Sequence, residues 1–428
     1  MKRYADMTHT ELEQTLAQLE EQYNAFKARG LDLNMARGKP SAAQLELSLP
    51  MLDTLDSASD LTASDGTDCR NYGVLAGIPE ARTFVADMVG ARPEQVIVCG
   101  ASSLNVMYDT IARAWTHGVA GNTPWGKLDT VRWLCPVPGY DRHFRICEHF
   151  GIEMIPVEMT PEGPDMDKVR ALVEGDASVK GIWCVPKYSN PQGYSYSDAT
   201  VRAFAQLKPA AADFRIFWDN AYAVHHLHDD AAHQDQILNI LDECERAGSP
   251  DMAFEFCSTS KITFPGAGIA AFVSSEANVA EACANMGAQT IGFDKLNQLR
   301  HVRFLKDAPT LAAHMSKHAA LLRPKFEAVL QIFDDELSAT GVGSWTRPNG
   351  GYFISFTAPE GTATEIVRLA ADAGVKLTGA GATWPHGVDP RDSDIRIAPS
   401  FPTLDDLVQA AHVFTVCVRL AAVRKLLA

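Results

Sequence analysis

Short apolar segments alternate with longer amphipathic ones along most of this chain, and this alternation is the feature that most constrains its fold. The short segments are rich in Val, Ile, Phe, Trp and Cys, as buried β-strands are. They cover residues 96–99, 131–135, 181–185, 216–218, 254–257 and 269–274. Strands that alternate with helices usually pair in parallel, and the helices pack on the faces of the sheet. The pattern therefore predicts an α/β fold with a mainly parallel sheet.

The pattern changes in the last third of the chain. A long helical stretch is followed by two strand-like segments that alternate with further helices, which is typical of a smaller α+β domain. These segments are 310–337, 351–356, 364–373, 395–398 and a closing helix from 403. A chain of 428 residues also exceeds the ~250–300 residues at which a single hydrophobic core stops growing. Two domains are therefore expected.

The domain limits can be set from the same pattern. We expect residues 51–308 to form the large domain and residues 309–428 the small one. Apolar residues recur at helical spacing between Thr8 and Gly30, so the chain opens with an amphipathic helix. We expect this N-terminal segment, residues 1–50, to pack with the small domain.

The charge balance excludes some classes of partner. The chain has 38 basic and 53 acidic side chains and a formal net charge of −15, which disfavours nucleic acid and anionic membrane. We see no signal peptide or membrane span and expect a cytoplasmic protein. Nine cysteines, none two residues apart, indicate reduced thiols. We predict no metal site, because the histidines and aspartates of 225–230 are neighbours on a short loop that rarely converge on one ion.

The segment Ser258-Thr259-Ser260-Lys261 follows an apolar strand and precedes a turn of small residues, 264–268. A lysine held at a strand end among hydroxyl groups is placed to lose its proton and form a Schiff base. The alternative is an ordinary exposed lysine. The lysine alone does not decide between them.

Two further segments support the chemical interpretation. The strand 216–218 ends in Asp219, where a carboxylate can keep a cofactor's ring nitrogen protonated, and Tyr222 follows three residues later. Taken alone, Asp219 could equally cap a helix. Asn190 lies in a turn, 188–193, whose residues would aim its amide at a cofactor ring.

The order Asn-Pro-x-Gly, then strand-Asp-x-x-Tyr, then Ser-x-Ser-Lys resembles the pyridoxal-phosphate (PLP) aminotransferases of fold type I. The resemblance covers nearly the whole chain. The segments 37–40, 138–144 and 265–268 are most similar to a divergent bacterial aspartate aminotransferase subgroup, once grouped with aminotransferase-like regulators. The resemblance implies a large domain with a mainly parallel sheet of the seven-stranded type and a smaller α+β domain.

The resemblance also implies how the cofactor is bound. Lys261 would carry PLP, Asp219 would pair with the ring nitrogen, Tyr222 and Asn190 would bind the ring oxygen, and Tyr140 would stack on the ring. The phosphate-binding residues implied are Gly100, Ala101, Ser102, Ser103, Ser258 and Ser260, with Tyr72 from a neighbouring subunit. A homodimer with shared active sites follows. One departure is that Gly268 occupies the stretch where the family usually has a phosphate-binding arginine.

The substrate contacts follow in the same way. Arg396 resembles the arginine that binds the substrate α-carboxylate, and Gly38, Lys39 and Asn190 lie in segments that contact substrate in the family. The distal carboxylate of an acidic substrate needs a second cation. Arg142 is our expectation, because it lies two residues beyond Tyr140. The alternatives are Lys39 and, from a partner chain, Lys295 or Arg300. Arg142 could instead pair with a neighbouring carboxylate such as Asp141 or Glu148.

The function implied is PLP-dependent transamination between an amino acid, with aspartate favoured, and 2-oxoglutarate, which gives oxaloacetate and glutamate. One alternative is an aromatic or kynurenine-type aminotransferase, or a PLP-dependent lyase, on the same scaffold. Another is a non-catalytic ligand-binding or regulatory protein, which the presence of Lys261, Asp219 and Arg396 disfavours.

Overall fold

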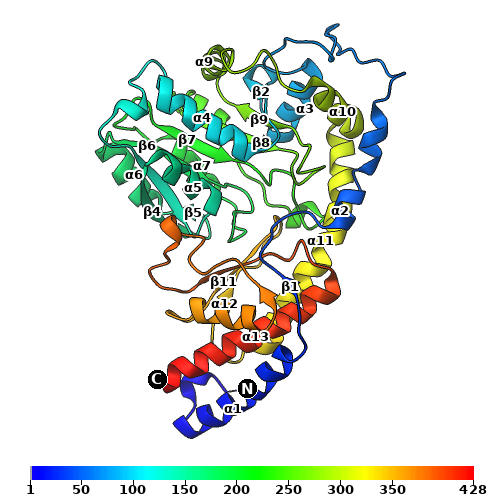
Figure 1. Cartoon of the computed structure of the whole chain (residues 1–428). Coiled ribbons are helices and arrows are strands. Elements are labelled where there is room, and N and C mark those ends of the chain that lie inside the picture. Colours follow the sequence, from blue (N-terminus) through cyan, green and yellow to red (C-terminus); the bar gives the residue numbers. More distant parts are fainter. Residues whose placement is uncertain (1) are drawn as a thin grey trace.

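The computed structural model describes residues 2–428 and consists of two units joined by one long helix. The larger unit holds a broad sheet covered by helices, and the smaller unit lies below it in Figure 1. The helix α11, Ala308–Leu337, runs from one unit to the other along one side of the molecule. Both chain ends lie at the smaller unit (Figure 1).

The larger unit is built on an eight-stranded sheet with the order β2-β9-β8-β7-β6-β3-β4-β5. The strands are β2 (Val96–Val98), β3 (Arg132–Val137), β4 (Glu153–Thr160), β5 (Gly163–Pro164), β6 (Val179–Cys184), β7 (Arg215–Asp219), β8 (Ala253–Ser258) and β9 (Ala270–Val273). The pairs from β4 to β8 are parallel, while β9 runs antiparallel to both β2 and β8. The predicted α/β class with a mainly parallel sheet is confirmed.

Helices cover both faces of this sheet. They are α3 (Pro79–Val89), α4 (Ser103–His117), α5 (Asp141–Phe150), α6 (Met166–Gly175), α7 (Asp198–Ala205), α8 (Ile240–Arg246), α9 (Glu276–Met286) and α10 (Lys295–Leu305). One face packs α4, α5 and α9 against aromatic strand residues such as Trp133, Trp183 and Phe217. The other face packs α3, α6, α7, α8 and α10. The inner strands are therefore buried on both sides, which explains their nearly continuous apolar sequence.

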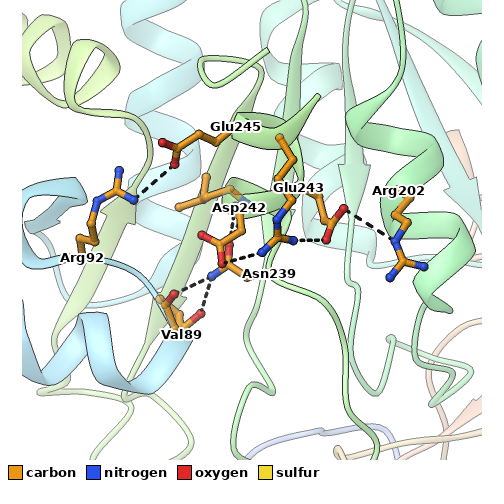
Figure 2. Close-up of polar contacts among 10 residues, drawn as sticks. Val89, Arg92, Arg202, Asn239, Asp242, Glu243 and Glu245 are labelled. Atoms are coloured by element: carbon orange, nitrogen blue, oxygen red, sulfur yellow. Dashed lines mark hydrogen bonds and ion pairs between the residues drawn. The ribbon is translucent and has the colours of Figure 1, made fainter. Parts of the chain in front are cut away.

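Polar contacts tie α8 to its neighbours on this face of the sheet (Figure 2). Asn239 caps α8 through Leu241 and Asp242, and its amide also donates to the carbonyls of Val89 and Gly90 at the end of α3. Further ion pairs in Figure 2 are Arg92–Glu245 and Arg202–Glu243. These contacts link α8 to α7 and to the end of α3.

Among residues 2–428, the smaller unit has two small sheets and three α-helices besides α11. Its strands are β1 (Leu33–Asn34), β10 (Ser344–Trp345), β11 (Ile354–Thr357), β12 (Val375–Lys376) and β13 (Asp394–Ile397). Its helices are α1 (His9–Lys27), α12 (Ala363–Asp372) and α13 (Leu404–Leu427). The short helix α2 (Ala42–Glu46) contacts α11. The order β10-β11-β13 is antiparallel, and β1 pairs in parallel with β12. α1 packs against α13 (Figure 1).

The helix α13 is long and apolar enough to cross a membrane by length and composition alone. However, 72% of its apolar stretch is buried inside the protein. Its side chains share one core with α11 and β11, including Phe333, Phe356 and Phe414. The helix is therefore the centre of the smaller unit's core.

Candidate active site

Five loops that carry the predicted site residues leave the sheet at the same edge. Four of them follow the parallel strands β3, β6, β7 and β8. The fifth follows β2, which runs in the same direction as β8 because β9, between them, is antiparallel to both. The carboxyl edge of a parallel sheet is where ligands bind in open α/β folds. The topology thus collects these loops in one place.

Asp219, at the end of β7, is almost fully buried. Its Oδ2 lies 3.0 Å from Nε2 of His143, and its Oδ1 is buried without a hydrogen-bond partner among residues 2–428. The His143 ring stacks on Trp183 with a centroid distance of 4.5 Å. Our sequence analysis missed His143, although its position one helical turn after Tyr140 was a usable signal. His143 therefore holds Oδ2 of Asp219, while Oδ1 lacks a hydrogen-bond partner among the described residues.

Lys261 lies in the loop after β8, and its Nζ lies 4.8 Å from the centre of the Tyr222 ring. Burial lowers the pKa of the Lys261 amine, and the negative charge of Asp219 partly opposes this shift. Side chains of the smaller unit and of α11 contact the backbone around Lys261. The Tyr352 hydroxyl lies 3.5 Å from the Lys261 carbonyl, and His314 Nε2 lies 2.8 Å from the Ile262 carbonyl. Burial thus shifts the Lys261 amine toward its neutral form, and these two contacts fix the backbone that carries it.

The loop between β2 and α4 forms a turn at the N-terminus of α4. Gly100 has φ +65°, a conformation that other residues rarely adopt. The Ser102 hydroxyl caps α4 by accepting from the Asn105 amide at 3.4 Å. The helix N-terminus provides the positive end of the helix dipole and free amides, which suit an anion. Near it, the Ser258 hydroxyl donates to Ser260 at 3.0 Å.

Gly268 packs closely against this loop. A Cβ atom at Gly268 would lie 3.0 Å from the carbonyl oxygen of Ala101 and 3.2 Å from Oγ1 of Thr259. A side chain there would force its neighbours to shift, and the Ala101 contact is backbone. The departure from the family at Gly268 is thus built into the packing of the loop.

Arg396, in β13, reaches from the smaller unit toward the larger one. Its guanidinium donates to Asn190 Oδ1 at 3.2 Å, to Asp141 Oδ1 at 3.0 Å and to Thr378 Oγ1 at 3.3 Å. The ring of Phe353 lies 4.9 Å from its Cζ. The structure therefore brings Arg396 and Asn190 together. Sequence analysis missed Asp141, Thr378 and Phe353 as its partners.

Other predicted residues lie farther from this group or at the surface. Tyr72 is 81% exposed. Arg142 is also exposed, with its Nε 3.9 Å from Asp141 Oδ2, and it borders a hollow of about 360 Å³ with Ser102. Lys39 lies over the ring of Phe401. Gly38 is packed against Phe353, which leaves no space for a side chain. Arg142, Lys39 and Tyr72 thus make no direct contact with Arg396 in this chain.

Comparison with known families assigns the chain. The family model described as aspartate amino-transferase matches residues 7–428. The chain belongs to the aspartate aminotransferase family. An aspartate aminotransferase of Corynebacterium glutamicum is 44% identical over 431 residues, covering 99% of both chains.

Solved structures agree with this assignment. The crystal structure of an aspartate transaminase from Corynebacterium glutamicum has a TM-score of 0.96 and 43% identity, covering 99% of both chains. A putative aminotransferase from Corynebacterium diphtheriae has a TM-score of 0.92 and 46% identity, covering 95% of this chain and 100% of that one. The predicted membership in the fold type I, PLP-dependent aminotransferases is confirmed. As a member of the aspartate aminotransferase family, the chain is an enzyme that catalyses transamination.

Proposed function

We propose that the enzyme transfers the amino group of aspartate to 2-oxoglutarate with PLP carried by Lys261, giving oxaloacetate and glutamate. The observation that carries the proposal is a lysine of lowered pKa that feels the charge of a buried carboxylate, Asp219, whose Oδ1 has no partner among the described residues. An isolated buried carboxylate oxygen costs free energy, so its partner is expected to be a ligand. A protonated pyridine nitrogen is such a partner.

The residues around Lys261 fit PLP. Asp219 Oδ1 would accept from the ring nitrogen, while His143 holds Oδ2. Tyr140, which begins α5, would cover one face of the ring, and Tyr222 and Asn190 would bind the ring oxygen. Burial raises the pKa of the Tyr222 hydroxyl, which keeps it a proton donor. Once bound, PLP supplies an electron sink that stabilises negative charge at the substrate Cα.

The phosphate would lie at the N-terminus of α4. The residues that would hold it are Gly100, Ala101, Ser102, Ser103, Ser258 and Ser260, with Tyr72 of a second subunit. Because Gly268 stands where the family usually has an arginine, and a side chain there would press on the Ala101 carbonyl, helix amides and hydroxyl groups would do more of the binding than in the rest of the family. The tight turn at Gly100 supports this arrangement by directing the chain into α4.

The protein groups then divide the work on the substrate. Arg396 and Asn190 would bind the α-carboxylate, because a guanidinium binds a carboxylate through two parallel hydrogen bonds. This contact fixes the Cα–H bond relative to Lys261. The Lys261 amine, whose pKa is lowered by burial, would take the Cα proton as general base and later return a proton as general acid.

The choice of an acidic substrate depends on the second cation. Arg142 remains our proposal, and Gly38 and Lys39 would contact the substrate from the N-terminal segment. We expect Arg142→Ala to lower kcat/KM for aspartate by ~10²-fold and to leave that for alanine nearly unchanged. Equal losses for both donors would show that Arg142 is structural, and the proposal would move to Lys39.

The reaction is tested by mixing the holoenzyme with single amino acids and following the cofactor absorbance. We expect aspartate to react with the highest kcat/KM and 2-oxoglutarate to reverse the change. A higher kcat/KM for kynurenine or aromatic amino acids would support the alternative aminotransferase. Pyruvate or ammonia formed without a 2-oxo acid acceptor would identify a lyase.

A further inference from the structure

We propose that Asp141 is a positioning residue that holds the α-carboxylate site closed in the absence of substrate, by occupying Arg396 until a substrate carboxylate replaces it. This inference rests on the proposed function, because it assigns Arg396 to the substrate α-carboxylate. Asp141 Oδ1 lies 3.0 Å from NH1 of Arg396. Among residues 2–428, Asp141 is the only carboxylate within 4.0 Å of this guanidinium.

The environment of Arg396 explains why a carboxylate is needed there. Its side chain is only 9% exposed, and its other partners are the neutral side chains of Asn190 and Thr378. A buried guanidinium without a counter-charge is strongly unfavourable. Asp141 supplies that charge. A substrate carboxylate would supply the same charge at the same donor atoms.

Asp141 is also placed so that it can leave. It is the first residue of α5, directly after Tyr140, and its side chain is 34% exposed. On losing Arg396, its carboxylate can be hydrated, and it remains at the N-terminus of a helix, where negative charge is favourable. Arg396 belongs to the smaller unit and α5 to the larger one, so the pair also joins the two units across the site.

Asp141 would therefore compete with the substrate carboxylate for Arg396. A ligand that must displace a bound group has an apparent dissociation constant equal to its intrinsic one divided by the fraction of sites that are open. Asparagine keeps the shape of Asp141 but removes the charge. We therefore expect Asp141→Asn to bind carboxylates more tightly, by about three- to tenfold, since a charged pair that is partly exposed is worth little more than this.

The test uses the holoenzyme and succinate, a dicarboxylate without an amino group, as the probe. Calorimetry should give a dissociation constant for succinate about three- to tenfold lower in Asp141→Asn than in the wild type. The KM for aspartate should fall by a similar factor, while kcat changes by less than about twofold. A residue with a purely structural role would not lower KM and leave kcat unchanged.

Glu148→Gln is the matched control. It removes the same charge from the same helix, but Glu148 pairs with Arg145 and His386 and does not contact Arg396. We expect its succinate affinity to equal that of the wild type. Unchanged or weaker succinate binding in Asp141→Asn, with a wild-type unfolding temperature, would overturn the inference. A wild-type holoenzyme that binds succinate but transfers no amino group from aspartate would instead contradict the proposed function.

Discussion

Glu255 is a buried acid whose ionisation should affect stability. It lies in β8, and its Oε1 accepts from Asn220 at 2.9 Å. Burial raises the pKa of Glu255 from 4.5 to about 7, and the Asn220 hydrogen bond opposes this shift. The folded protein thus keeps a proton that the unfolded chain releases. Between about pH 4.5 and 7 the free energy of unfolding should therefore fall by about 3 kcal/mol in total as pH rises, with no further loss above pH 7.

Glu255→Gln tests this at the level of one residue. The variant cannot ionise, so it should unfold at nearly the wild-type temperature at pH 5 and about 3 °C higher at pH 8. Calorimetric scans at both pH values at one scan rate provide the measurement. An advantage of the variant that is equal at both pH values, or larger at pH 5, would contradict the assignment.

Some site residues could be predicted from the sequence because they follow strands. Lys261, Asp219 and Asn190 each stand just beyond an apolar segment, so strand position and residue type identified them. His143 and Asp141 could not be identified in this way. Their roles depend on contacts with Asp219 and Arg396, which lie 76 and 255 residues away in the chain.

At the level of elements, a buried ion pair fixes the middle of the sheet. Lys180 in β6 lies 2.6 Å from Asp213 Oδ1, and Trp125 donates to Oδ2 at 2.8 Å. Both charged side chains are almost fully buried. Asp213→Ala leaves the Lys180 charge and the Trp125 N–H without partners. It should lower the free energy of unfolding by ~3–5 kcal/mol, measured by urea titration.

The exposed pair of Asp32 and Lys376 is the control for this prediction. Its atoms are 2.8 Å apart, but the side chains are 81% and 63% exposed. Asp32→Ala should change the free energy of unfolding by less than ~1 kcal/mol. If Asp213→Ala lowered the free energy of unfolding by no more than Asp32→Ala does, the Lys180–Asp213 pair would not be important for the stability of the sheet.

The strands buried on both faces were the ones that the sequence predicted well. The expected segments 216–218 and 254–257 differ from β7 and β8 by one residue at each end. β4 was missed because four of its eight residues are exposed and a proline, Pro156, stands inside its short apolar run. β1 and β12 are two residues each, and their pairing of Leu33 with Val375 spans most of the chain. No local pattern encodes such a contact.

For the whole molecule, we expect a homodimer with active sites shared between subunits. Tyr72 and Ile291 are 81% and 61% exposed. Their chain neighbours Gly73 and Gly292 are in close contact, so the two side chains belong to one surface region. Exposed apolar groups that gather on one surface mark an interface. Sedimentation should therefore give about twice the chain mass of 46.5 kDa.

Co-expression of two differently tagged variants tests whether the active sites are shared between subunits. If Tyr72 acts on the partner's site, a heterodimer of Lys261→Ala and Tyr72→Ala has one site with both changes and one intact site. The purified heterodimer should then have about half of the wild-type activity, well above either homodimer. If Tyr72 acts within its own subunit, both sites of the heterodimer carry one change, and no activity is regained.

The most direct measurement follows the amino group itself. Holoenzyme would be given ¹⁵N-labelled aspartate and 2-oxoglutarate, and ¹⁵N-glutamate would be measured by mass spectrometry. We expect the wild type to form labelled glutamate and Lys261→Ala to form none, because Lys261 combines a pKa lowered by burial with a position beside Tyr222 and so is placed to move the Cα proton. Labelled glutamate formed by Lys261→Ala at the wild-type rate, or none formed by the wild type, would contradict the proposed reaction.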